Sequence, residues 1–236
     1  MTSPLEPLLT SRSNSDSAKQ PKFGEQAYQR ERNAMVNQQI IPHGVNNQTV
    51  LEAMRAVPRH RFVPEPEKDW AYADRPVPIG LGQTISQPYM VAYMTEQLEL
   101  SGTEKVLEIG TGCGYQTAIL GLLAREVVSV EIIQELARPT AKRLAGFGYE
   151  NLRLLLGDGS GGYDPDAPYD RIIVTAASDH PVDKLRSQLK PGGRMLVPMG
   201  QIHDTQQLMQ IDRMADGGFR EQELMLVRFV PLTGTH

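Results

Sequence analysis

From Lys105 onward, short apolar segments alternate with segments that have the residue spacing of amphipathic helices. A strand, a helix and a second strand in succession are typical of a parallel sheet with helices packed on its faces. The last apolar segments, 205–214 and 223–232, flank a turn at 216–218 and predict a closing hairpin. The pattern predicts an α/β fold with a doubly wound parallel sheet. Strands are predicted at 105–109, 125–133, 152–158, 169–177 and 194–200, and helices at 134–148 and 182–189.

The first hundred residues have a different character. Residues 1–24 are rich in Ser, Pro and polar groups without a regular period, so we expect a disordered tail there. Residues 25–236 then form a single domain. Within it, a helical and loop region at 25–100 precedes the α/β core at 101–236.

Helices are predicted in the N-terminal region at 27–39, directly after Asn46 or Asn47 as an N-cap, and at 90–98. Residues 57–89 between them contain six prolines, which exclude a long regular element. An irregular segment of this length within a compact domain usually has a function.

The composition argues against several classes of protein. Lys and Arg number 24 against 28 Asp and Glu, for a net charge of −4, and a chain without a dense basic cluster is poorly suited to bind nucleic acid. No apolar segment is long enough to span a membrane, and the N-terminus does not resemble a secretory signal. The single cysteine, Cys113, excludes an internal disulfide and a cysteine-based metal cluster. We therefore expect a cytoplasmic monomer with no metal, nucleic-acid or membrane partner.

A glycine-rich turn follows the first predicted core strand. The sequence VLEIGTGCGYQT, residues 106–117, places Gly110, Gly112 and Gly114 between that strand and a helix. Backbone at such a turn can approach a ligand closely, and the helix N-terminus favours anionic groups. A dinucleotide site has its third glycine one position later, where this chain has Tyr115, so a dinucleotide is disfavoured. A tight turn without any ligand remains an alternative.

Two acidic residues end the next two predicted strands. Glu131 lies about 20 residues beyond the glycine turn, where an acid can accept hydrogen bonds from ribose hydroxyls. Asp158 ends the third strand and could contact an adenine amino group. For each acid alone, a solvated strand end or a helix cap is the better explanation. Because the carboxyl ends of parallel strands form one edge of a sheet, the three positions together favour a cofactor site.

Several segments resemble a known family. VLEIGTGCGYQT, VEII, GDG, IIVTAA and LKPGGR resemble the motifs of Rossmann-like S-adenosylmethionine-dependent methyltransferases. VPRHRFVP, GQTISQPYMVA and VRFVPL are similar to protein-L-isoaspartate (D-aspartate) O-methyltransferases, and the similarity runs from about Arg32 to Thr233. The resemblance implies a Rossmann-like sandwich with extra N-terminal helices. It also implies methylation of the free carboxylate of isoaspartyl residues in damaged proteins, with S-adenosyl-L-methionine as the cofactor.

The resemblance also assigns site residues. It implies that Ser86 is the active-site residue and that no metal takes part. The residues that the resemblance places at the cofactor are Gln83, Thr84, Ile85, Gly110, Thr111, Gly112, Gly114, Glu131, Asp158, Gly159 and Thr233.

This chemistry needs no general base, because a carboxylate is ionised at neutral pH and a sulfonium is an excellent leaving group. Ser86 would then orient the acceptor carboxylate. Its spacing alone indicates a cap for the helix after Pro88 instead. The five histidines are scattered through the sequence and are read as ordinary surface or turn residues, with His60 the least certain.

Competing functions remain open at this stage. They are methylation of a small carboxylate or other acceptor, a cofactor-binding module without catalysis, nucleic-acid methylation and dinucleotide oxidoreduction. The chain also departs from the family pattern at His43, Cys113, Ser160 and Tyr163, which leaves its fine specificity open.

Overall fold

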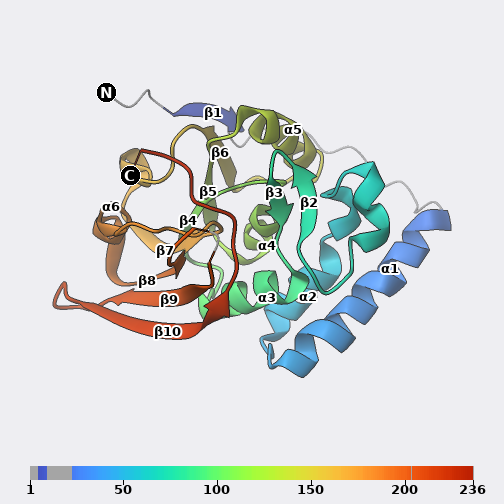
Figure 1. Cartoon of the computed structure of the whole chain (residues 1–236), viewed down its shortest axis with the longest axis horizontal. Helices are drawn as coiled ribbons and strands as arrows, with labels where there is room; N and C mark the ends of the chain where they lie inside the picture. Colours follow the sequence, from blue (N-terminus) through green and yellow to red (C-terminus); the bar gives the residue numbers. More distant parts are fainter. Residues whose placement is uncertain (1–4, 10–22, 203, 236) are drawn as a thin grey trace.

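A computed structural model describes residues 5–9, 23–202 and 204–235. Its centre is an eight-stranded sheet in the order β1-β6-β5-β4-β7-β8-β9-β10, with β1 and β10 at opposite edges (Figure 1). The strands are β1 (Glu6–Leu9), β4 (Lys105–Ile109), β5 (Glu126–Glu131), β6 (Leu152–Leu156), β7 (Tyr169–Val174), β8 (Leu189–Met199), β9 (Gln206–Arg213) and β10 (Phe219–Val227).

The middle of the sheet is parallel and its edges are antiparallel. β6, β5, β4, β7 and β8 run parallel, whereas β1, β9 and β10 each pair antiparallel with a neighbour. This confirms the doubly wound parallel core and the closing hairpin. β8 begins at Leu189, before the predicted start at 194, because the chain enters the sheet directly after a short helix.

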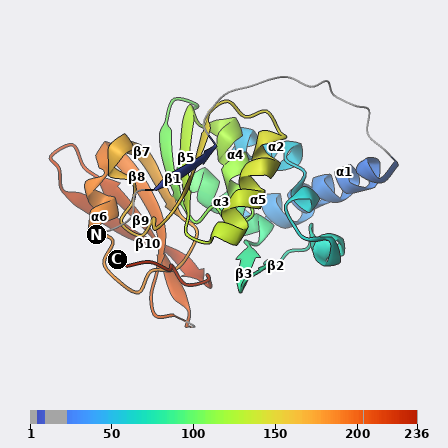
Figure 2. The same cartoon turned by 90° about the horizontal axis from the view of Figure 1, so that it is seen from above.

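Helices cover both faces of the sheet (Figure 2). The helices of the chain are α1 (Phe23–Met35), α2 (Gln48–Ala56), α3 (Pro88–Gln97), α4 (Tyr115–Leu123), α5 (Gln134–Ala145) and α6 (Asp183–Ser187). Val106 of β4 packs in one apolar cluster with Ile119 of α4, and the next residue, Leu107, packs in another with Leu185 of α6. Successive side chains of a strand point to opposite faces, so β4 is buried on both sides. The sheet is therefore the middle layer of a sandwich.

The N-terminal helices pack beside α4 on one side of the sheet (Figure 2). Asn47 is the N-cap of α2, and its side-chain oxygen accepts hydrogen bonds from the backbone N–H groups of Thr49 at 3.1 Å and Val50 at 3.2 Å. Of the two predicted caps, Asn47 is thus the correct one. α1 continues at Val36–Ile40 as a π-helical turn followed by a 3₁₀ turn at Ile41–His43.

The proline-rich segment contains only short elements, as its composition predicts. These are 3₁₀ turns at Arg59–Arg61 and Glu65–Trp70 and the hairpin of β2 (Val77–Gly80) with β3 (Gln83–Ile85). The hairpin lies beside the end of the sheet that carries the glycine turn, since a Cβ on Gly112 would lie 3.6 Å from the Ile79 side chain. This segment therefore brings residues near position 80 to the core site.

The prediction of disorder over residues 1–24 is wrong for Glu6–Leu9. These residues form β1, and Leu9 pairs with Leu154 of β6. Without β1, the outer edge of β6 would present unpaired backbone groups, and an added strand satisfies them. Residues 1–4 and 10–22 lie outside the described residues. No helix in the described ranges is both long and apolar enough to cross a membrane.

Candidate active site

The glycine turn joins β4 to α4, and at Gly110 its backbone conformation allows only glycine. Gly110 has φ 95°, and a Cβ there would lie 2.5 Å from Oγ1 of Thr175. Both the backbone conformation and the close contact therefore require glycine. Gly112 has φ 54°, and a Cβ there would lie 3.6 Å from the Ile79 side chain, which is an ordinary contact. The turn thus packs against β7 on one side and borders a cavity on the other.

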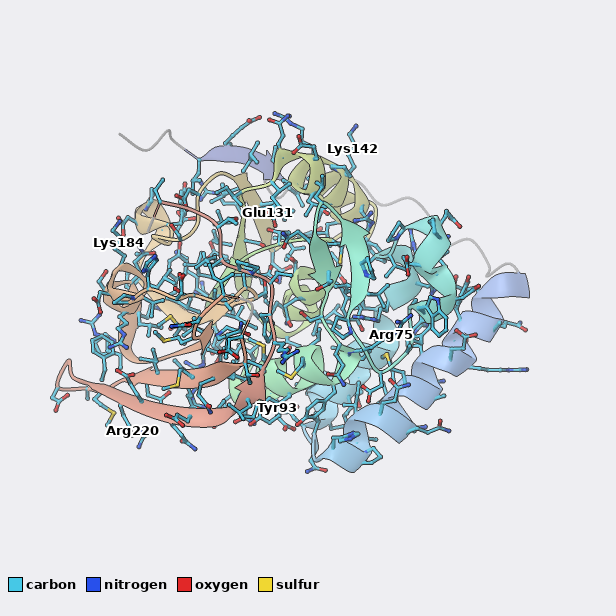
Figure 3. The ribbon with its side chains drawn as sticks, in the orientation of Figure 1. Arg75, Tyr93, Glu131, Lys142, Lys184 and Arg220 are labelled. Atoms are coloured by element: carbon cyan, nitrogen blue, oxygen red, sulfur yellow. The ribbon has the colours of Figure 1, made fainter. Side chains whose placement is uncertain are left out.

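Glu131 ties the end of β5 to this turn. Its Oε2 accepts a hydrogen bond from the backbone N–H of Gly112 at 2.7 Å, and its Oε1 accepts one from Ile133 at 2.9 Å. The side chain is buried and points into the molecule, unlike the surface residue Lys142 (Figure 3). Burial raises its pKa, and the backbone N–H groups partly offset this. Each carboxylate oxygen can accept a second hydrogen bond, so Glu131 can also bind a ligand's hydroxyl groups.

A second buried acid lies beneath the turn and is not among the residues that the sequence predicts. The Oε2 atom of Glu108 accepts hydrogen bonds of 2.6 Å from the hydroxyls of Thr117 and Ser129, and Ser129 also contacts Thr111 at 2.6 Å. Glu108 is fully buried, its Oε1 has no hydrogen-bond partner among the described residues, and burial raises its pKa to about 7. Its sequence position, inside an ordinary apolar strand, does not distinguish this environment from that of other strand residues.

The turn cavity lies between the glycine turn, the β2–β3 hairpin and the C-terminal segment. Its apolar wall is formed by Ile79, Ile109, Val130, Ile132, Ile133 and Leu136. Of the residues predicted at the cofactor, those that line it are Gln83, Thr84, Gly110, Gly112, Glu131, Gly159 and Thr233. An apolar slot with a buried carboxylate at one end suits a flat aromatic base attached to a ribose.

Asp158 does not line the turn cavity. Its Oδ2 accepts hydrogen bonds from the backbone N–H and the hydroxyl of Thr235 at 2.7 and 2.8 Å, and its Oδ1 accepts one from the backbone of Ser160 at 2.9 Å. These bonds lower its pKa to about 2 although burial acts in the other direction. Asp158 thus anchors the C-terminal segment, which carries Thr233 to the cavity. Its predicted contact with adenine stays a prediction.

The C-terminal segment crosses the carboxyl ends of the strands after β10 (Figure 1). It is held by two backbone hydrogen bonds with Ala177, which follows β7: Ala177 donates to Val230 at 2.8 Å and accepts from Leu232 at 2.7 Å. This crossing turns residues that are distant in sequence into one wall of the site.

Ser86 lies between β3 and α3 and is half-buried. The N-cap residue of α3 is Gln87, so the alternative in which Ser86 caps that helix is wrong. Ser86 lines a small second cavity, the Ser86 cavity, together with the predicted residues Thr84, Ile85, Gly110, Thr111 and Gly112. Gly114 lines neither this cavity nor the turn cavity, because it packs against Thr140 and Leu144 behind the turn.

Ser86 also borders the open cleft, a cavity of about 510 Å³. Its walls are the start of α3, with Gln87, Tyr89 and Met90, and the segment 225–230 at the end of β10. The residues shared by the turn cavity, the Ser86 cavity and the open cleft are Thr84 and Thr175. The three cavities therefore adjoin one another, and Ser86 lines two of them, the Ser86 cavity and the open cleft.

The positions of His43 and His60 bear on whether a histidine acts together with Ser86. His60 is buried and does not line the open cleft; its ring stacks on Tyr28 with centroids 3.8 Å apart and its Nδ1 lies 2.8 Å from the Tyr72 hydroxyl. His43 lines the open cleft, and its Nδ1 lies 2.6 Å from the backbone oxygen of Gln39. Neither one is placed beside Ser86 by a hydrogen bond that the structure describes. In the described ranges no three His, Cys, Asp or Glu residues are grouped to hold a metal ion.

Comparisons with known proteins identify the family. The family model of protein-L-isoaspartate(D-aspartate) O-methyltransferase matches residues 30–236. The chain is 50% identical over 203 residues to protein-L-isoaspartate O-methyltransferase of a Picosynechococcus strain, which covers 86% of this chain and 90% of that protein. It is 53% identical over 194 residues to the protein of the same name from Myxococcus xanthus, covering 81% and 92% of the two chains.

The chain belongs to the protein-L-isoaspartate(D-aspartate) O-methyltransferase family. A solved protein-L-isoaspartate O-methyltransferase superposes with a TM-score of 0.77 at 26% identity, over 87% of this chain and 66% of the other. A Plasmodium falciparum protein solved in complex with S-adenosyl-L-homocysteine has the same fold, with a TM-score of 0.74 at 21% identity, over 86% of this chain and 98% of the other. The protein is therefore an S-adenosylmethionine-dependent methyltransferase that acts in the repair of isoaspartyl residues.

The turn cavity fits the family's cofactor. A Cβ at Gly159 would lie 2.9 Å from a side-chain carbon of Val130, so glycine there keeps the end of β5 and the cavity wall close together. Glu131 is suited to the ribose, the apolar wall to adenine, and the turn to the amino-acid part. When bound, the cofactor supplies a methyl group on a positively charged sulfonium. Of the predicted cofactor residues, Ile85, Thr111, Gly114 and Asp158 do not line the turn cavity, and the remaining seven do.

Proposed function

We propose that methyl transfer takes place at Ser86, where the cofactor side and the acceptor side of the site meet. The observation that supports this most strongly is that Thr84 and Thr175 line all three cavities, while Ser86 lines the Ser86 cavity and the open cleft. In this proposal an acceptor in the open cleft meets the cofactor of the adjoining turn cavity beside Ser86.

Ser86 is proposed to orient the acceptor carboxylate. A serine hydroxyl donates one hydrogen bond, and a carboxylate oxygen accepts it while keeping other lone pairs free for reaction. The acceptor is already ionised at neutral pH, so the chain needs no base to remove a proton. What the residues contribute is placement and the exclusion of water. The buried apolar side chains of Ile85 and Val91 beside the Ser86 cavity serve this second purpose.

Selection of isoaspartyl over aspartyl residues is proposed to depend on the backbone path through the open cleft. An isoaspartyl residue has one additional methylene in the main chain and a free α-carboxylate. The cleft has walls from two directions, α3 with the segment before it and the end of β10. Walls on both sides can distinguish the two chain geometries without reading the side chains, and D-aspartyl residues are a second acceptor of related geometry.

We place the enzyme in the cytoplasm as a monomer whose partners are damaged proteins and peptides. The single cysteine, Cys113, is buried and is compatible with a reducing compartment. Light scattering of the purified chain at several concentrations tests the monomer directly.

The role of Ser86 is tested by substitution. Ser86→Ala is expected to lower kcat/KM for an isoaspartyl peptide about tenfold or more, because a hydrogen bond to a charged group is lost. Calorimetric affinity for S-adenosylhomocysteine should change less than about twofold, since Ser86 does not line the turn cavity. Ser187→Ala on the exposed side of α6 is the matched control. Unchanged kinetics in Ser86→Ala would contradict the proposal.

A further inference from the structure

Arg59 is a buried cation directly behind Ser86. It lies in the 3₁₀ turn Arg59–Arg61 and is 0% exposed. Its Nε donates a hydrogen bond to the backbone oxygen of Ala71 at 2.6 Å, and its Nη2 donates one to the backbone oxygen of Ser86 at 2.7 Å. The guanidinium carbon lies 4.9 Å from the centre of the Tyr115 ring. Arg59 thus connects the proline-rich segment, the Ser86 segment and the first residue after the glycine turn.

The charge of Arg59 has no carboxylate partner among the described residues. Its neighbours are backbone oxygens, Tyr115, Tyr72 and Cys113, and its third nitrogen, Nη1, is buried without a hydrogen-bond partner. Burial lowers the pKa of Arg59, yet an arginine stays protonated at neutral pH. In contrast, Arg194 of β8 is paired with Asp212 at 2.7 Å. A buried cation without an anion is costly, and neutral residues of similar size pack in such places more favourably.

The residues around Arg59 also line the site. Ser86, Cys113 and Tyr115 all border the Ser86 cavity. This cavity opens toward the cleft in which an acceptor carboxylate is proposed to bind. The positive charge beneath it is shielded from water by protein, so its attraction for an anion in the cavity is stronger than that of a surface arginine. In this arrangement, the acceptor carboxylate would be the anion that faces the buried charge of Arg59.

We infer that Arg59 is a positioning residue that holds the Ser86 segment through its carbonyl group and favours an anionic acceptor beside Ser86. The inference rests on the proposed acceptor site, and it adds a source of discrimination between a carboxylate and its neutral counterpart. A hydroxyl group alone, such as that of Ser86, binds a carboxylate and an amide with similar geometry. The buried guanidinium distinguishes them by charge.

The test compares two peptides that differ only in charge. One contains isoaspartate, and the other has a primary amide in place of its free α-carboxylate. Both are titrated by calorimetry into enzyme saturated with S-adenosylhomocysteine, so that binding is measured without turnover. The variants are Arg59→Met, which removes charge and hydrogen bonds, and Arg59→Lys, which keeps the charge. Arg61→Met is the control, since Arg61 is an exposed arginine of the same turn.

In Arg59→Met, the isoaspartyl peptide is expected to bind about tenfold more weakly, the amide peptide less than about threefold more weakly, and S-adenosylhomocysteine within about twofold of wild type. Arg59→Lys should recover most of the difference between the two peptides. Equal weakening of both peptides, or a parallel loss of S-adenosylhomocysteine binding, would overturn the inference and leave a purely structural role.

If Arg59→Met does not fold, Arg59→Lys decides. Its single amine cannot hold both the Ala71 and Ser86 carbonyls in the same geometry, so isoaspartyl peptide binding should weaken about threefold with S-adenosylhomocysteine binding unchanged. No change in peptide binding would contradict the inference. If Ser86→Ala loses peptide binding while the folded Arg59 variants bind peptide normally, the inference about Arg59 fails and the proposed acceptor site stands.

Discussion

The cofactor side and the acceptor side of this site are built in different ways. The turn cavity is formed at the ends of adjacent parallel strands, and its main polar residue, Glu131, is buried and hydrogen-bonded to the backbone of the glycine turn. The open cleft is formed by α3, the residues before it and the end of β10, which are distant in sequence. The cofactor side is therefore centred on the backbone of one hydrogen-bonded turn, with the β2–β3 hairpin and the C-terminal segment as further walls, whereas the acceptor side is formed between segments distant in sequence.

This difference predicts how each side responds to substitution. Changes in the turn cavity alter backbone that has no room to move, so they should weaken the binding of S-adenosylhomocysteine strongly. Changes at the exposed rim of the cleft remove single contacts from a wide space, so they should have small effects on peptide binding and none on the cofactor.

The largest effect is expected from Gly110→Ala. The new Cβ would lie 2.5 Å from Thr175 Oγ1, at a residue with φ 95°. S-adenosylhomocysteine should bind more than about 100-fold more weakly by calorimetry, because the turn must shift to relieve the overlap. Gly148→Ala is the control, since Gly148 has φ 75° but no neighbour within 4 Å. Equal loss of affinity in the two variants would mean that the effect is not specific to the glycine turn and would contradict this prediction.

A smaller effect is expected from Glu131→Gln. One end of a glutamine side chain is a donor, so it would face the N–H of either Gly112 or Ile133, and one of these would lose its acceptor. An unpaired buried group costs about 1–3 kcal/mol, so S-adenosylhomocysteine should bind roughly 10- to 100-fold more weakly. Glu135→Gln in the exposed first turn of α5 is the control. Wild-type affinity in Glu131→Gln would contradict the assignment of the ribose to this carboxylate.

The buried acid beneath the turn gives a pH dependence. The pKa of Glu108 is about 7 in the folded protein, above the ordinary value of about 4.3 in an unfolded chain. Between these values the folded state holds a proton that the unfolded state has released, so the free energy of unfolding falls as pH rises through this range and levels off above it.

Glu108→Gln should remove this dependence. Between pH 5 and 8, wild type should lose on the order of 2 kcal/mol more unfolding free energy than the variant, as measured by urea denaturation. Parallel curves for the two proteins across this range would mean that Glu108 is ionised in the folded state.

The smallest effect is expected from His43→Ala on the acceptor side. His43 is exposed at the rim of the cleft, with its ring 5.2 Å from that of Tyr89. Removing it should weaken isoaspartyl peptide binding by no more than about threefold and leave S-adenosylhomocysteine affinity unchanged, because one exposed contact is lost. A change of tenfold or more would show that the cleft wall is as tightly built as the turn cavity.

The same difference explains what the sequence could predict. The parallel core, the glycine turn and Glu131 follow from local patterns, because strand ends and tight turns are specified by a few neighbouring residues. The family resemblance located Ser86, but its spacing alone favoured a helix cap that the structure replaces with Gln87. β1 could not be predicted, because the short segment Glu6–Leu9 gains its pairing from a distant edge strand.

Two residues of the site had no local signal. Glu108 has the sequence setting of an ordinary strand residue, and its burial follows from helices packed on both faces of the sheet. Arg59 lies among charged residues in a proline-rich segment, and only the folded chain brings it to the Ser86 carbonyl. Asp158 was predicted from its strand end, yet its hydrogen bonds go to Thr235, which local sequence does not connect with it.

The most direct test of the central claim is transfer of labelled methyl from S-adenosylmethionine to a pair of peptides that differ only in isoaspartate against aspartate. The account predicts methylation of the isoaspartyl peptide and at most trace labelling of the aspartyl one. Equal labelling of both peptides, or none of either by enzyme that binds S-adenosylhomocysteine, would contradict the assignment of the cleft beside Ser86 as the isoaspartyl site.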